Sequence, residues 1–83
     1  MIDVKQAAQI ALNYFSELNP GKLQNLALEE VELTDDEENW LVTLGYNLPT
    51  VNIFGNGSTE REYKVFRIDA KGGKVASMKI KKI

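Results

Sequence analysis

The chain has 83 residues, of which 43% are hydrophobic and 27% charged, and its formal net charge is −2. This length and composition predict one globular domain, residues 1–83, with a single thin hydrophobic core. Histidine and cysteine are both absent, which excludes disulfides, Ser-His-Asp and Cys-His catalysis, and structural zinc held by those residues. We therefore expect a protein that is not an enzyme, with no catalytic residues, no metal site and no cofactor.

The first predicted element is an amphipathic helix over residues 3–18. Asp3 is placed to cap its N-terminus, with Gln6 as the partner in a capping box. Pro20 and Gly21 end it. The apolar residues recur at steps of three and four and form one broad face, which must pack against the strands that follow: Val4, Ala7, Ala8, Ala11, Leu12, Phe15 and Leu18.

Two strands are predicted next, over residues 23–34 and 40–47, with a polar turn at residues 35–39 between them. In the first strand the apolar alternation slips across Glu29 and Glu30, which predicts a β-bulge. The second strand contains the only tryptophan of the chain and alternates strictly, so that four large residues share one face: Trp40, Val42, Leu44 and Tyr46.

The longest predicted connection is residues 48–60, with the sequence LPTVNIFGNGSTE. Pro49 is expected to end the preceding strand. Val51 and Phe54 are apolar residues in a segment that would otherwise be a solvated loop. Two interpretations stay open: the segment caps the core or extends the flanking strands into a long hairpin, or it contacts a partner.

Strands over residues 61–69 and 74–82 form a last hairpin around a turn at residues 70–73. The predicted fold class is α+β, with one N-terminal helix packed on a four-stranded antiparallel sheet in an α-β-β-β-β meander. We expect the helix to cover Trp40, Val42, Leu44, Phe66, Ile68, Met78 and Ile80. We expect the other face to expose Leu41, Thr43, Tyr63, Val65, Arg67, Val75, Ser77 and Lys79.

Charge is unevenly distributed along the chain. Seven of the twelve acidic residues fall within residues 29–38, and five lysines fall within residues 71–82. The simplest interpretation is a solvated acidic hairpin and lysines that protect an edge strand, but such asymmetry can also steer a partner. Residues 35–38 lack the spacing of an EF-hand, and residues 55–57, Gly-Asn-Gly, precede a strand rather than a phosphate-binding helix.

The same composition limits partners and compartment. A net acidic domain argues against nucleic-acid binding, and no run is apolar enough for a membrane span or a signal peptide. The lack of cysteine fits a reducing compartment and also exported bacterial domains. A complete chain would be cytoplasmic, and a chain whose leader was removed would be extracytoplasmic.

Residues 63–80, YKVFRIDAKGGKVASMKI, resemble the strand, Asp-Gly turn and strand signature of PepSY-type domains. DVKQAAQIALNYF is similar to their Ala-rich first helix, and WLVTLGY is similar to the aromatic-led strand between. The resemblance implies a helix packed on an antiparallel sheet, in a family of mostly secreted or membrane-linked proteins associated with peptidase propeptides and the inhibition or regulation of peptidases. Residues 48–60 look like an insertion relative to that family.

Together these features favour a non-catalytic protein-interaction module, which would regulate a peptidase if the resemblance extends to function. The partner would contact the uncovered face of the sheet and the 48–60 connection, through Leu41, Val51, Phe54, Tyr63, Val65 and Arg67. Three alternatives stay open: a structural homodimer joined through the same face, a cystatin-like inhibitor or immunity-type binder, and a solvated face whose β-branched residues serve only strand formation.

Overall fold

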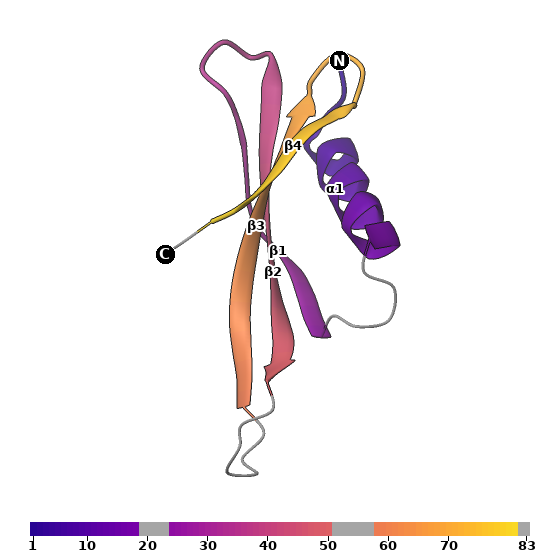
Figure 1. Ribbon diagram of the computed structural model, residues 1–83. Helices are drawn as coiled ribbons and strands as arrows, with labels where there is room; N and C mark the ends of the chain where they lie inside the picture. The colour runs from indigo at the N-terminus through magenta and orange to yellow at the C-terminus, as the bar shows by residue number, and fades with distance from the viewer. Residues whose placement is uncertain (19–23, 51–57, 82–83) are drawn as a thin grey trace.

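A computed structural model describes residues 1–18, 24–50 and 58–81 of the chain. Helix α1 (Val4–Leu18) is followed by strands β1 (Gln24–Leu33), β2 (Asn39–Thr50), β3 (Ser58–Asp69) and β4 (Val75–Ile80). The strands form an antiparallel sheet in the order β1-β2-β3-β4, and α1 lies against one side of it (Figure 1). The predicted α-β-β-β-β meander is therefore confirmed.

The start of the helix is held by its own cap and by the sheet. The backbone N–H of Asp3 donates to Gln6 Oε1 and that of Gln6 donates to Asp3 Oδ1, both at 2.8 Å, which is the predicted capping box. One residue earlier, the backbone N–H of Ile2 donates to the carbonyl of Ala70 at 2.7 Å. The Trp40 indole N–H donates to the carbonyl of Ile2 at 3.2 Å. These bonds fix where α1 enters the sheet.

The face that α1 buries is narrower than the sequence predicts. Ala7, Ala11 and Phe15 are buried, at steps of four residues. The two alanines let the helix backbone approach the sheet closely, while Phe15 fills the space at its C-terminal end. Val4 and Leu18, which we predicted on the apolar face, continue the line of this stripe by three-residue steps but lie at the two ends of the helix, and they are exposed.

Strand β1 is irregular at two places. Its pairing with β2 shifts near Asn25, whose φ is 54°, and again between Leu28 and Glu30. The second shift leaves Glu29 as the extra residue and confirms the bulge predicted across Glu29 and Glu30. The bulge also shifts the alternation of β1 by one residue, so Glu30 points to the side of the sheet opposite to that of Leu28.

Strands β2 and β3 form a hairpin that is longer than the sequence predicts. Pro49, which we expected to end the strand, pairs with Thr59. Over the described residues β1 pairs with β2 as far as Asn47, so among these residues the missing N–H of Pro49 interrupts no second ladder. Of the interpretations left open for residues 48–60, extension of the flanking strands is the one that this pairing supports.

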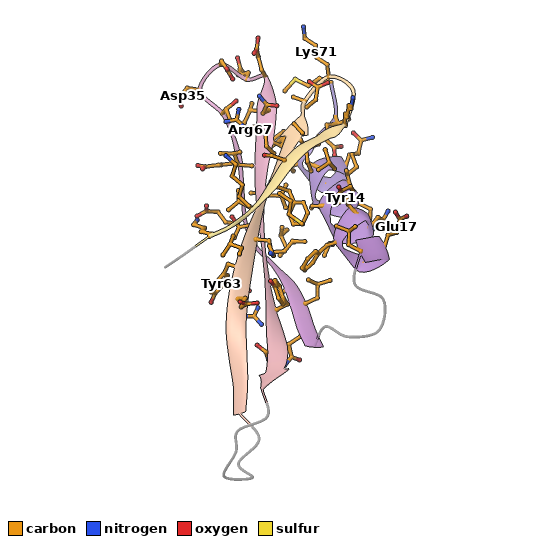
Figure 2. All side chains as sticks on the ribbon, in the orientation of Figure 1. Tyr14, Glu17, Asp35, Tyr63, Arg67 and Lys71 are labelled. Atoms are coloured by element: carbon orange, nitrogen blue, oxygen red, sulfur yellow. The ribbon has the colours of Figure 1, made fainter. Side chains whose placement is uncertain are left out.

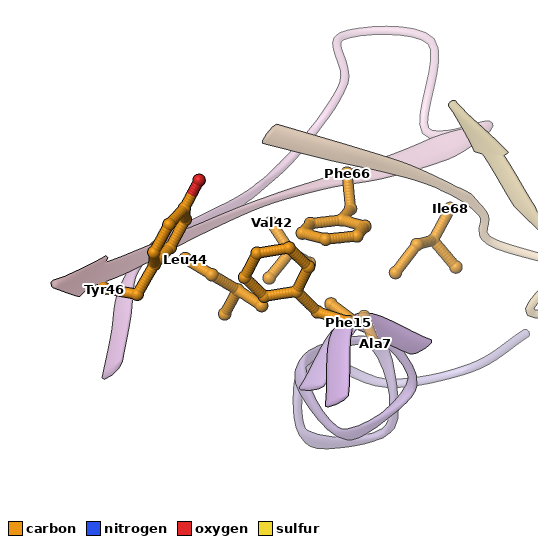
Figure 3. Close-up of a cluster of buried hydrophobic side chains, with 8 residues drawn as sticks. Ala7, Phe15, Val42, Leu44, Tyr46, Phe66 and Ile68 are labelled. Carbon is orange, nitrogen blue, oxygen red and sulfur yellow. The ribbon is translucent and has the colours of Figure 1, made fainter. Parts of the chain in front are cut away.

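The hydrophobic core lies between α1 and the central strands (Figure 3). Phe15 contacts Phe66 edge-on, with ring centroids 5.7 Å apart, and Tyr46 at a tilt, with centroids 5.0 Å apart. Trp40 and Met78 pack against this cluster and are partly buried, as predicted. The buried cluster itself consists of Ala7, Ala11, Phe15, Val42, Leu44, Tyr46, Phe66 and Ile68.

Two predictions about β4 are wrong. Ile80, assigned to the covered face, is 64% exposed, because α1 packs on β1, β2 and β3 and does not reach the end of this edge strand. Val75, assigned to the other face, packs against the core. A register shift between Arg67 and Ile68 adds one residue on β4 and places Val75 opposite Ile68, so the alternation of the strand is reversed at its start.

Candidate functional site

We call the face of the sheet that turns away from α1 the open face, and two rows of its side chains cross all four strands. The strand register sets both rows. Tyr63 and Arg67 lie on this side of the sheet in Figure 2, opposite the helix residues Tyr14 and Glu17. From β1 to β4, the first row is Glu32, Leu41, Arg67 and Ser77, and the second is Glu30, Thr43, Val65 and Lys79.

The open face contains a hollow of about 460 Å³. Its floor is formed by Leu41, Thr43 and Val65 from the two central strands. Thr43 is only 4% exposed although no helix covers it, so the neighbouring side chains shield the deepest part of the floor. The walls come from the two edge strands: Glu30 and Glu32 on β1, and Lys79, Ile80 and Lys81 at the end of β4.

The walls differ in charge and reach each other across the floor. Lys81 Nζ lies 3.4 Å from Glu30 Oε1, with the side chains 40% and 56% exposed respectively. An ion pair this exposed contributes little to stability. It matters for shape instead, because β1 and β4 are the outermost strands of the sheet and can meet in this way only if the two edges curl over the open face.

A second feature of the open face is a cluster around Arg61. Arg61 Nη2 lies 2.5 Å from Glu29 Oε1, and Nη1 donates to the carbonyl of Asn25 at 3.0 Å and to Asn47 Oδ1 at 3.2 Å. The hydrogen bond to Glu29 is the main cause that raises the pKa of the guanidinium above its ordinary value. Arg61 thus joins β3 to both irregular parts of β1.

Gly45 of β2 makes room for this cluster. A Cβ at this position would lie 2.8 Å from Arg61 Nη2 and 2.9 Å from Glu29 Cγ, so the ion pair crosses directly over the glycine. The Arg61 guanidinium also lies 5.9 Å from the centre of the Tyr63 ring, within the range of a cation–π contact. Tyr63 is therefore part of the Arg61 cluster rather than of the hollow.

The predicted contact residues are distributed over this face as follows. Leu41 and Val65 lie together in the hollow. Arg67 pairs with Leu41 at the neighbouring position of β3 and is exposed. Val51 and Phe54 lie outside the described residues. The sequence did not predict the Arg61 cluster, nor that the two charged walls enclose one hollow. The signal available for Arg61 was Gly45, a glycine in the middle of a strongly predicted strand.

The acidic turn between β1 and β2 uses one of its carboxylates for its own structure. Asp36 Oδ1 accepts hydrogen bonds from the Thr34 hydroxyl at 2.5 Å and from the backbone N–H of Glu38 at 3.0 Å. The Thr34 bond is the main cause that lowers the pKa of Asp36 below its ordinary 3.8. Over the residues that the structure describes, no three acidic side chains come together as a possible metal site.

Tyr46 is the buried titratable group of the core. Its hydroxyl donates to Glu62 Oε1 at 3.3 Å. Burial is the main cause that raises the pKa of Tyr46 above its ordinary 10.0, and the negative charge of Glu62 adds to it. This pair lies on the covered side of the sheet, away from the hollow.

No protein-family model, curated protein or solved structure matches the chain. The resemblance to PepSY-type domains therefore stays a prediction. Within residues 1–18, 24–50 and 58–81, no helix has the length and apolar character needed to cross a membrane.

Proposed function

We propose that the chain is a non-catalytic protein-interaction module that binds a protein partner in the hollow of its open face. The observation that carries the proposal is an apolar floor, Leu41 and Val65, framed by an acidic wall on β1 and a basic wall on β4. Contact surfaces of proteins commonly combine an apolar centre with a charged rim. The combination of apolar floor and charged walls in the hollow supports a binding role.

The chemistry of the side chains supports a binding role over a catalytic one. The sequence has no histidine or cysteine, which removes the imidazole base and the thiolate nucleophile that act near neutral pH. The shifted pKa values of Asp36 and Arg61 follow from hydrogen bonds that close a turn and hold a bulge. Each shift has a structural cause, so neither needs a catalytic role to explain it.

The hollow also defines the kind of partner that fits it. A complementary partner would place apolar side chains on the floor, a basic residue toward Glu30 and an acidic residue toward Lys79. Regulation of a peptidase, which the PepSY-type resemblance implies, is one form that such binding can take. Leu41 and Val65 are already partly exposed, so such a partner can reach them without a change in the strands.

Site-specific photo-crosslinking in the native cells tests this proposal. A photoreactive residue at Leu41 should capture a protein partner that mass spectrometry can identify, while the same group at Asn13, which is exposed on α1, should not. With the partner purified, Lys79→Glu should weaken binding at least ~10-fold through the lost charge complementarity. Val65→Asp should weaken binding by a similar factor, because it places a charge on the apolar floor.

The control for both variants is a thermal melt by circular dichroism, and Lys79 is exposed, so its variant should melt like the parent. The proposal fails if Leu41 captures no more protein than Asn13. It fails equally if the captured partner binds both variants as tightly as the parent chain.

A further inference from the structure

We infer that the occupant of the hollow is a second copy of this chain, packed face to face on the open face. This inference rests on the proposed function, because it requires the open face to be a contact surface. It goes further by naming the partner and the orientation. The wall charges carry it, since they are complementary to each other and lie on opposite edges of the same face.

The orientation follows from symmetry. Glu30 and Glu32 lie on β1, Lys79 and Lys81 lie at β4, and the strand order puts these strands at the two edges of the sheet. A two-fold axis that runs parallel to the strands, between β2 and β3, places β1 of each copy over β4 of the other. Both acidic walls then face basic walls, as an isologous interface requires.

The competing orientation is excluded by the same charges. A two-fold axis perpendicular to the strands would place β1 over β1 and β4 over β4, so that acidic walls and basic walls each meet their own kind. Like charges that face each other across an interface cost several kcal/mol. One of the two face-to-face arrangements is therefore strongly favoured. Both arrangements keep the strand axes of the two sheets nearly aligned, as in other sheet-on-sheet packings, so the wall charges distinguish them.

The Glu30–Lys81 pair makes this association feasible. The two walls already meet at 3.4 Å within one chain, so their side chains are long enough to span the floor. On association each Glu30 exchanges its own lysine for one of the other copy. Ion pairs are conserved in this exchange, while the apolar floors around Leu41 and Val65 leave water, which supplies the favourable free energy.

Sedimentation of the purified chain and of reciprocal charge-reversal variants tests the inference. The parent should sediment with twice the mass of one chain at micromolar concentration. The acid-to-base variant Glu30→Lys with Glu32→Lys, and the base-to-acid variant Lys79→Glu with Lys81→Glu, should each weaken self-association at least ~10-fold. An equimolar mixture of the two should form a heterodimer about as tight as the parent dimer, because opposite charges meet at both walls.

Circular dichroism melts test whether both variants are folded, and the mixture itself distinguishes lost charge pairing from unfolding, since unfolded chains should not form the heterodimer. A parent that stays monomeric at several hundred micromolar overturns the inference. So does self-association that neither variant weakens, or a mixture that remains monomeric. If the parent is monomeric while a photoreactive Leu41 still captures another protein, the proposed function stands and only the identity of the occupant is wrong.

Discussion

The position of the core can be tested by comparing two apolar residues of the sheet, Phe66 and Ile80. Phe66 is fully buried and Ile80 is 64% exposed, although periodicity alone assigns both to the covered face. Truncation to alanine should therefore change the stability very differently at the two positions. We expect Phe66→Ala to lower the free energy of unfolding by about 3–5 kcal/mol, and Ile80→Ala to change it by no more than ~0.5 kcal/mol.

The magnitude for Phe66 follows from its neighbours. Its ring lies 5.7 Å from Phe15 and 6.1 Å from Tyr14, both edge-on, and each such pair adds about 0.5–1.5 kcal/mol to simple burial. Phe15 is buried and cannot move to fill the cavity, whereas Tyr14 is partly exposed and can. The loss should therefore lie near the middle of the range. At ~4 kcal/mol the melting temperature would fall by about 15–30 °C.

Urea denaturation followed by Trp40 fluorescence measures both changes. Trp40 is partly buried and its indole is hydrogen-bonded to Ile2, so its emission reports the folded state. If Phe66→Ala leaves too little folded protein, Phe66→Leu should still cost about 1–2 kcal/mol through the lost ring contacts. Equal costs for the two alanine variants, or a cost below ~1 kcal/mol for Phe66→Ala, would contradict this account of the core.

Three further predictions concern the contacts that hold the sheet. Gly45→Ala should cost about 1–2 kcal/mol because its methyl group meets both Arg61 and Glu29; adding Arg61→Ala should reduce that extra cost, and strictly additive costs in urea would refute the steric explanation. Burial raises the pKa of Tyr46 above 10.0. The protonated side chain should therefore contribute its full stabilisation below pH 10, and this contribution should be lost as the pH rises through the raised pKa. Tyr46→Phe should flatten this alkaline decline in melting temperature. Thr34→Val should raise the pKa of Asp36 toward 3.8, as measured by carbon-13 NMR, because the main cause of its lowering is lost; an unchanged pKa would contradict that cause.

The centre of the core was predictable because it depends only on alternation within single strands. Val42 and Leu44 in β2, and Phe66 and Ile68 in β3, are buried as the period-two pattern predicts. β4 was not predictable in the same way. β4 has one extra residue opposite Arg67 and Ile68. No change in the alternation of apolar residues in the sequence indicates this register shift.

The hollow was only half predictable. Leu41 and Val65 follow from alternation, since they are the apolar residues that remain on the uncovered face. The walls do not, because Glu30 and Lys81 are 51 positions apart in the chain and belong to strands that are not neighbours. They meet through the curl of the whole sheet. That curl depends on the twist of every strand between them, which local sequence does not specify.

The Arg61 cluster connects the local irregularity of β1 to the charge of the hollow. Regular pairing beyond Leu28 would place Glu30 opposite Val42, on the side that α1 covers; the bulge places it opposite Thr43 instead. The extra residue that makes this difference is Glu29, and Arg61 holds its carboxylate across Gly45. A side chain at position 45 would remove the room for that pair. The acidic wall of the open face therefore depends on a glycine that carries no charge and does not line the hollow.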